Sequence, residues 1–402
     1  MTRRPPIIPA LFAVLLGLLM AASALAAEPP QARRPAPGQP NPKLLRERRR
    51  ILGARPLAMY YYTEDASGLA SAEKNAAQIT VLAPQCFAVD AEGIVRGAVP
   101  APLAELARRS DLPLMPLVVN PGFDRSIASS LLRDPRKQER AASYLAYLAS
   151  RENLAGWQLD LEYIDPADKA RYSAFVRRVA AKLHRDGRLL SVAVTPRFSD
   201  EYPDPRAAEF RTGEWGAPFD LRALGQSVDF LVLMTYDHHG NTTAPGPVAG
   251  YEWARAAIEY AAGRVPPQKL VVGIPFYGRE WVETAGGRIS RSLTFSRLQP
   301  LLARPQVQVQ WDERWRAPWL QFREGTEVHT VWFDDRRSYR EKLELVRRYR
   351  LRGFAAWRLG TEDPQFWDAA AEHAKSLAPP ARRKAPRRAP RGRSRAASPR
   401  RR

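Results

Sequence analysis

Three polar residues alternate with apolar ones in the stretch GWQLDLEY, residues 156–163. Gln158, Asp160 and Glu162 stand at every second position, so on a β-strand their side chains point to one face. The residues between them, which point to the other face, are apolar: Trp157, Leu159 and Leu161. Since the apolar set must pack against covering elements, the polar set is expected to point into the interior of a sheet or barrel. Burying acids there costs free energy, so a functional role is expected for them.

The two acids of this stretch have the spacing of a proton-sharing pair. Alternate Cα atoms of a strand lie roughly 6.6 Å apart, so the side chains of Asp160 and Glu162 can share a hydrogen-bonded proton. Two adjacent carboxyl groups resist joint ionisation, which raises the apparent pKa of one of them and suits a general acid at neutral pH. The structural alternative is a pair of acids satisfied by Arg or Tyr side chains in a layered core.

Eight short apolar runs, alternating with amphipathic helical stretches, are expected to position these acids. The runs are PLAMYYYT, QITVLAP, LPLMPLVVN, LAGWQLDLEY, RLLSVAVTP, VDFLVLMTY, KLVVGIPFY and GFAAWRLG. Eight strand and helix units over about 320 residues predict a (β/α)₈ TIM barrel, an α/β fold, spanning residues 57–378. Glu162 then lies nearest the C-terminal end of the fourth strand, the face on which barrel active sites are built.

The segment after the seventh strand departs from this alternation. Residues 279–337 contain strand-like pieces and many aromatics, which predicts a small α+β insertion that walls one side of the cleft. Its tryptophans are expected to form a satellite core, and the alternative is an extended binding groove. These tryptophans are Trp281, Trp311, Trp315, Trp319 and Trp332.

Both ends of the chain read differently from the middle. Residues 1–26 combine Arg3 and Arg4 with an apolar run and an A-x-A site, which predicts a signal peptide and export to the periplasm or the outside. A transmembrane helix is the alternative, although the apolar run is short for one. Residues 27–56 predict a Pro-rich basic linker with a short basic helix at its end, and no transmembrane segment is expected after signal cleavage.

The net charge of +21 is concentrated at these ends, and the folded part is nearly neutral. Residues 379–402 hold 11 Arg or Lys and no acids, which predicts a disordered basic tail. An exported tail of this kind could hold anionic envelope polymers, whereas no specific nucleic-acid partner is expected. A solvated tail without a specific partner is the alternative.

Neither a metal nor a cofactor is expected. Cys86 is the only cysteine and has no base nearby in sequence, so a buried structural thiol is expected. The pair His238 and His239 lacks a third ligand at a recognisable spacing. The remaining histidines are expected at the surface: His184, His329 and His373.

At the fourth strand the chain resembles glycoside hydrolase family 18, the chitinase and N-acetylglucosaminidase family. The signature D-G-x-D-x-D-x-E reads here Ala155-Gly156-Trp157-Gln158-Leu159-Asp160-Leu161-Glu162. LMTYD, GIPFYGREW and WRLG are similar to the sixth-, seventh- and eighth-strand motifs of the family. EYIDPADKARYSAFV and MTYDHHGNTTAPGPVA resemble the bacterial branch that includes spore-cortex-lytic N-acetylglucosaminidases.

The resemblance implies a role for each matched residue in a retaining, substrate-assisted reaction. Glu162 would protonate the glycosidic oxygen, Asp160 would orient the 2-acetamido nitrogen, and Tyr236 would hydrogen-bond the acetamido oxygen. Further residues are expected to contact the sugar: Gln158, Met234, Asp237, Trp357 as the apolar floor, Asn120, Tyr277 and Arg279. The substrate would be β-linked N-acetylglucosamine in peptidoglycan or a chitin-like glycan.

Two positions depart from the family pattern, since Ala155 and Gln158 replace its first two acids. A neutral amide at 158 removes a like charge from beneath Asp160, so the pKa of Asp160 and the pH optimum should differ from those of relatives with three acids. Because these two acids are missing, a non-catalytic, lectin-like glycan-binding protein is the alternative. Retention of Glu162 favours the enzyme.

Overall fold

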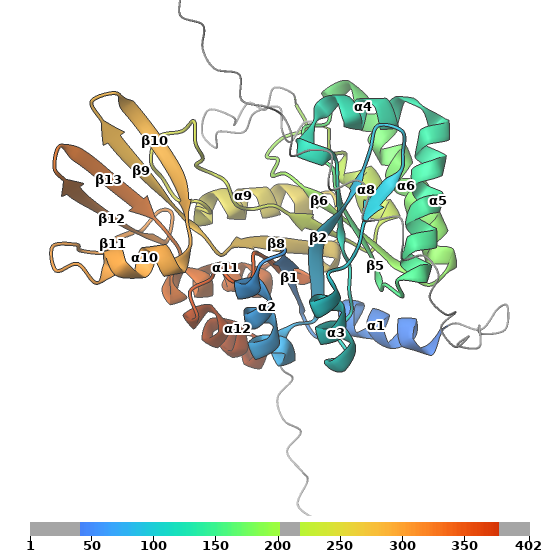
Figure 1. The fold of residues 1–402 in the computed structure, drawn as a ribbon, viewed down its shortest axis with the longest axis horizontal. Helices are drawn as coiled ribbons and strands as arrows, with labels where there is room; N and C mark the ends of the chain where they lie inside the picture. The colour runs from blue at the N-terminus through green and yellow to red at the C-terminus, as the bar shows by residue number, and fades with distance from the viewer. Residues whose placement is uncertain (1–40, 202–217, 378–402) are drawn as a thin grey trace, which may run out of the picture. The chain divides into compact units, whose positions relative to one another are not determined.

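The computed structural model describes residues 41–201 and 218–377, and these ranges contain a closed parallel β-barrel surrounded by helices (Figure 1). Its eight strands are β1 (Leu57–Tyr62), β2 (Val81–Val89), β4 (Leu117–Val119), β5 (Gly156–Asp160), β6 (Leu189–Val194), β7 (Phe230–Leu233), β8 (Leu270–Pro275) and β14 (Gly353–Trp357). The predicted TIM barrel is confirmed.

Strand register closes the barrel without a free edge. β1 pairs in parallel with β14 on one side and with β2 on the other, through Met59↔Ala355 and Met59↔Val81. The strands between follow in chain order around the ring. A short antiparallel strand, β3 (Val95–Gly97), extends β2 beyond the barrel.

Helices cover the outside of the barrel and bury its largest apolar cluster against the strands. They are α2 (Ala66–Asn75), α3 (Ala101–Arg109), α4 (Arg125–Arg133), α5 (Pro135–Arg151), α6 (Lys169–Arg185), α8 (Leu221–Ser227), α9 (Tyr251–Ala262), α11 (Arg336–Arg348) and α12 (Gln365–Ser376). Tyr172, Phe175, Val176, Val179 and Leu183 of α6 recur at helical spacing, and all are fully buried. No helix within the described residues is long and apolar enough to cross a membrane.

The end of the expected linker packs against the barrel. Residues Pro42–Leu52 form helix α1; a short basic helix was expected here, but its burial was not. Ile51 is fully buried in the cluster that fills the inside of the barrel, with Leu57 and Phe230. Arg50 donates to the carbonyl of Ile79, just before β2, at 2.7 Å. α1 therefore closes the N-terminal end of the barrel.

Ile51→Ala is expected to lower the free energy of unfolding by about 2–5 kcal/mol, because it empties a site inside the barrel. Leu45→Ala on the same helix is the matched control, since Leu45 is 38% exposed, and should change it by less than about 0.5 kcal/mol. Chemical denaturation of both variants measures the difference. Equal effects would show that α1 is not part of the core.

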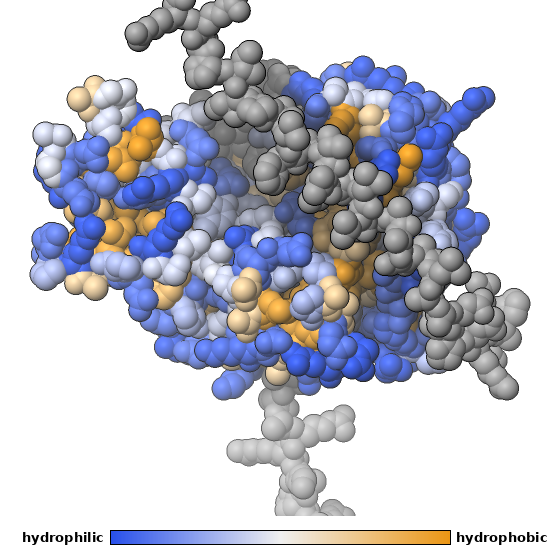
Figure 2. All heavy atoms as spheres, in the orientation of Figure 1, coloured by the Kyte–Doolittle hydropathy of each residue, from blue (hydrophilic) through white to orange (hydrophobic). Residues whose placement is uncertain are grey.

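The insertion after β8 is a five-stranded antiparallel sheet with one helix, as predicted. Its strands are β9 (Gly278–Thr284), β10 (Gly287–Leu293), β11 (Gln310–Asp312), β12 (Ala317–Glu324) and β13 (Glu327–Trp332), with α10 (Phe295–Leu302) after β10. Trp281 and Trp332 form a buried cluster against which Trp315 and Trp319 pack, so a satellite core is present. The surface is hollowed between this sheet and the half of the barrel that carries α4 and α5 (Figure 2).

Two of the three histidines expected at the surface are buried, which corrects that expectation. His329 is 5% exposed because its ring stacks on Phe322 and its Nδ1 lies 2.7 Å from the buried Glu280 carboxylate. His373 is 9% exposed because it continues the apolar face of α12. His184 is exposed, as expected.

Candidate active site

The side chains of strand β5 point to the two faces that the alternation predicted. Trp157 lies in the outer core, where its indole nitrogen donates to the carbonyl of Leu145 on α5 at 2.9 Å. Gln158 points into the barrel, where its amide donates to the hydroxyl of Tyr61 on β1 at 3.0 Å. Asp160 therefore shares the inner face with Gln158.

Asp160 is the more deeply buried of the two acids. Its side chain is 4% exposed, and burial raises the pKa of its carboxyl to about 7. One carboxyl oxygen, Oδ1, is buried without a hydrogen-bond partner among the described residues. The structure thus puts a titration near neutral pH on Asp160, with burial as its cause.

Gln158 is held within the barrel and cannot exchange a proton with Asp160. Its amide is fully buried, and the Tyr61 hydroxyl that it binds is kept neutral, because burial first and then the charge of Asp160 raise the pKa of Tyr61. Tyr61 was not among the site residues predicted from the sequence. Its position in the run YYY gave a signal, since alternation turns Tyr61 inward while Tyr60 and Tyr62 turn outward.

A pH profile tests what this amide does. Gln158→Asp places a second carboxyl beneath Asp160, so like charge should raise the pH at which the pair loses its last proton. The acid limb of kcat should therefore move to higher pH, whereas Gln158→Asn should leave it in place. Initial rates from pH 4 to 9 measure this, and identical limbs in all three proteins would refute the effect.

Glu162 lies just beyond the end of β5, and its backbone is fixed by Asn120 at the end of β4. The Asn120 side-chain oxygen accepts from the Glu162 amide at 3.0 Å, and its amide nitrogen donates to the Glu162 carbonyl at 3.1 Å. The same nitrogen donates to the carbonyl of Asp124 at 3.0 Å. Asn120 is fully buried, so the structure gives it a positioning role. Its expected contact with the sugar stays a prediction.

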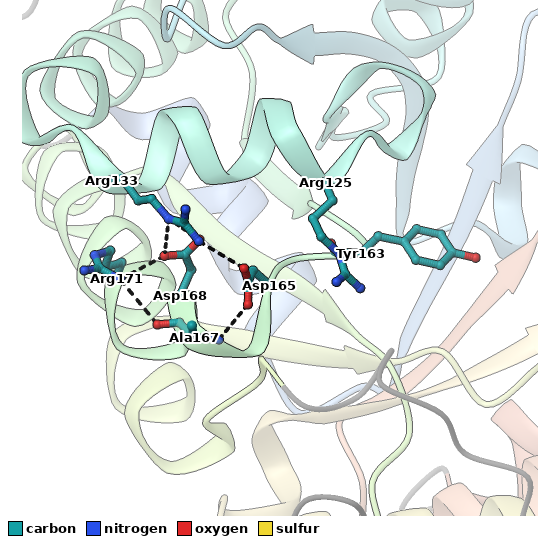
Figure 3. A network of polar contacts seen from close by, with 7 residues as sticks. All are labelled: Arg125, Arg133, Tyr163, Asp165, Ala167, Asp168 and Arg171. Atoms are coloured by element: carbon teal, nitrogen blue, oxygen red, sulfur yellow. Dashed lines mark hydrogen bonds and ion pairs between the residues drawn. The ribbon is translucent and has the colours of Figure 1, made fainter.

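The loop after Glu162 is also held from α4, as Figure 3 shows. Arg125 donates to the carbonyl of Tyr163 at 3.2 Å, and Arg133 reaches the carboxylates of Asp165 and Asp168, both at 3.0 Å. Asp168 is fully buried, and although burial opposes ionisation, its hydrogen bonds to Arg133 and neighbouring groups hold its pKa low. The loop that carries the acid is thus attached to a rigid helix.

Asn120→Ala is expected to lower kcat by about 10²-fold, because misplacing a catalytic group by about 1 Å has an effect of that size. KM should change much less, since the side chain is buried and lies behind the acid. Steady-state kinetics on a soluble oligosaccharide measures both, and a melting curve shows that the fold persists. An unchanged kcat would contradict the positioning role.

Tyr236, Met234 and Trp357 form the wall beside the acids. Tyr236 and Met234 are buried in one cluster, and Trp357 packs against both this cluster and the inner barrel. Burial raises the pKa of Tyr236 well above its usual range, and Tyr61, Asp160 and Glu162 act in the same direction. Tyr236 is therefore a neutral phenol that can donate a hydrogen bond. The Trp357 ring lies 5.2 Å from that of Tyr61 at the barrel mouth.

The other predicted sugar contacts lie at the rim. The Tyr277 hydroxyl donates to the Asp237 carboxylate at 2.7 Å. Arg279 is bound to the side chain of Asn241 and lies 3.9 Å from Asp237, which connects the insertion to the loop after β7. The structure thus groups Asp237, Tyr277 and Arg279, and their contact with a sugar stays a prediction.

The family model for glycosyl hydrolases family 18 matches residues 101–362, which carry β5, β7, β8 and β14 and the residues described above. The chain belongs to glycosyl hydrolase family 18. It is a glycosidase with a TIM-barrel catalytic domain.

Its relatives include proteins that act on spore cortex and chitinases. The chain is 31% identical over 251 residues to the cortical fragment-lytic enzyme of Bacillus subtilis, covering 62% of this chain and 56% of that one, so it spans little more than half of this relative. The structure of the Bacillus megaterium spore cortex-lytic enzyme SleL matches with a TM-score of 0.72 at 26% identity, over 79% of this chain and 74% of that chain. A chitinase from Chromobacterium violaceum matches with the same TM-score of 0.72, at 28% identity over 79% and 98% of the chains.

Nothing in the described part of this family 18 barrel forms a group of three or more His, Cys, Asp or Glu side chains that could hold a metal. His238 stacks on Trp253, with ring centroids 4.8 Å apart. Burial raises the pKa of Cys86 to about 12, so it is a thiol at neutral pH. The expected signal peptide, residues 27–40 of the expected linker and the basic tail lie outside the described residues.

Proposed function

We propose that the chain is an exported, retaining glycosidase that cleaves β-linked N-acetylglucosamine in peptidoglycan, with the substrate's own 2-acetamido group as nucleophile. The observation that carries this is Asp160, a buried carboxyl with a pKa near 7 and an unpartnered oxygen, beside the neutral phenol of Tyr236. A carboxylate and a phenol at such a site suit the N–H and the C=O of one acetamido group.

In the first step, Glu162 donates its proton to the glycosidic oxygen while the C1–O bond breaks. The acetamido oxygen forms a bond to C1, and the leaving chain departs as an alcohol. The resulting oxazolinium ion carries its positive charge at the nitrogen that faces Asp160, and ionised Asp160 stabilises it. Tyr236 donates to the acetamido oxygen and orients it before the attack.

In the second step, ionised Glu162 takes a proton from water, and the water oxygen attacks C1. The bond between C1 and the acetamido oxygen breaks, which restores the acetamido group. Two inversions at C1 give net retention. Asn120 and Arg125 supply the fixed backbone that keeps Glu162 in reach during both steps.

Peptidoglycan is preferred to chitin because the relatives at 31% and 26% identity are named for cortex lysis. A hollow of about 500 Å³ beside Asn120, between the ends of β2 and β4, leaves room for further sugars along the mouth. Trp357 supplies the apolar floor on which the scissile ring would stack.

Product mass spectrometry on purified sacculi and on chitooligosaccharides tests this function. We expect fragments with N-acetylglucosamine at the new reducing end from sacculi, at higher rates than from chitooligosaccharides. Faster release from chitooligosaccharides would overturn the substrate. Tight glycan binding with no release from either polymer would favour the lectin-like alternative.

A further inference from the structure

The end of the barrel opposite the active site is strongly basic, and nothing in the reaction uses it. Helices α1, α6 and α11 end there, and so do the loops that lead into β1, β6 and β14. Six exposed arginines at this end form no ion pair with a described residue: Arg46, Arg49, Arg55, Arg185, Arg348 and Arg350. We call these six residues the basic face.

Contacts of α1 with the barrel establish that these arginines lie at one end. Arg48 pairs with Asp229 just before β7 at 3.2 Å, and Lys43 donates to the carbonyl of Asn153 before β5 at 2.9 Å. Arg352, just before β14, donates to the carbonyl of Gly53 at 2.7 Å. Because α1 touches the loops before several strands, it lies across the N-terminal end of the barrel and carries its exposed arginines outward.

Most acids at this end already form ion pairs with other basic residues. Asp229 pairs with Arg48, Glu152 with Arg151 and Glu344 with Arg347. Asp111 and Asp186 are also exposed at this end, and these two acids are outnumbered by the six arginines. Basic residues in the last turn of a helix also favour its dipole, but that effect does not account for Arg46 and Arg55, which lie outside the last turn of α1.

At the opposite end of the barrel, acids and arginines are mixed. Asp65, Asp165 and Asp237 stand in the loops after the strands, and each faces an arginine: Arg358, Arg133 and Arg279. The excess of unpaired arginines at the basic face therefore favours an approach to an anionic surface with that end first and the active site facing away.

The described unit begins and ends at the basic end. The chain enters the fold at Pro42 on α1, and it leaves after α12, which contacts the 3₁₀ turn Ala76–Gln78 that precedes β2. The tail that follows adds 11 further Arg or Lys. Leu45, 38% exposed, stands among the arginines of α1, the mixture of cations and apolar groups typical of interfacial helices. Hydrophilic residues cover the lower edge of the molecule in Figure 2, around α1 and α12.

We propose that the basic face binds the anionic headgroups of a phospholipid bilayer and presents the active site to glycan on the side away from the membrane. The occupant is a lipid surface because the face is broad, carries an unpaired positive charge complementary to anionic headgroups, and has an exposed Leu45 beside Arg46 and Arg49.

Vesicle co-sedimentation of residues 27–402, which retain the whole compact unit from Pro42 onward, tests the proposal. The vesicles are phosphatidylcholine alone or with about one third phosphatidylglycerol. The test variant is Arg46→Gln, Arg49→Gln and Arg55→Gln together. The control is Arg136→Gln, Arg297→Gln and Arg323→Gln. It removes the same charge from exposed arginines on α5, α10 and β12 that form no ion pair with another described residue. A third protein lacks residues 379–402.

We expect roughly a fivefold loss of affinity for anionic vesicles per arginine of the face, about 100-fold for the triple variant, and little loss for the control. Tail deletion should weaken binding without abolishing it, and hydrolysis of soluble oligosaccharide should be equal in all four proteins. Equal binding by test and control variants would overturn the proposal, as would complete loss on tail deletion. Selective binding to a soluble polyanion such as heparin, without vesicle binding, would also overturn it and leave the glycosidase unaffected.

Discussion

Replacing Glu162 by Gln is expected to lower kcat by about 10²- to 10⁴-fold, the usual contribution of a positioned general acid. The amide keeps the size of the side chain but has no proton to give to the leaving oxygen and cannot take one from water. Asn120 binds the backbone of residue 162, and the substitution leaves these bonds in place, so the loop should keep its position. Binding of the glycan should therefore change little.

Initial rates of reducing-end release and a calorimetric Kd for the same oligosaccharide separate these two effects. Glu283→Gln, on the exposed part of β9 in the insertion, is the matched control and should hydrolyse at the normal rate. Release by Glu162→Gln at the rate of the unmodified chain would remove Glu162 from the reaction.

Replacing Asp160 by Asn is expected to abolish most activity and, at pH 8, to stabilise the fold. The pKa of Asp160 is raised from 3.8 to about 7 by burial, so the folded state binds this proton more tightly than the unfolded state does. The contribution of protonated Asp160 to the free energy of unfolding is fully present below about pH 4 and is lost as the pH rises to about 7. The loss is about 4 kcal/mol, and the substituted amide cannot ionise, so the variant avoids it.

Chemical denaturation at pH 4 and pH 8 measures this gain. The variant and the unmodified chain should differ little at pH 4 and by up to about 4 kcal/mol at pH 8. Asp186→Asn, an exposed acid at the other end of the barrel, should show no pH-dependent difference. A variant that is less stable than the unmodified chain at pH 8 would show that ionised Asp160 is not strained in the fold.

The sequence predicted the elements of the site well because its signals are local. Strand alternation placed Trp157 outward and Gln158 and Asp160 inward, and the structure agrees. The eight apolar runs and the aromatic insertion likewise depend on short-range periodicity, which a single sequence shows directly.

Contacts between distant segments were not predictable in the same way. The partner of Gln158 is Tyr61, 97 positions away across the barrel, and Asn120 holds Glu162 from the neighbouring strand. The burial of Ile51 depends on α1 meeting the open end of the barrel. His329 is buried because Glu280 and Phe322 come from other strands of the insertion. Such pairings depend on the topology of the fold, and the periodicity of a single segment does not predict them.

The anomer formed first from a β-linked N-acetylglucosamine oligomer tests the central claim most directly, because it records how the acetamido group and the two acids act at C1. Proton NMR of the reducing-end signals, taken within minutes of adding the protein, reads it before mutarotation. Attack by the acetamido oxygen, followed by water on the face that the leaving group vacated, predicts the β-anomer. First appearance of the α-anomer would mean a single displacement by water, and the roles assigned to Asp160 and Glu162 would be wrong.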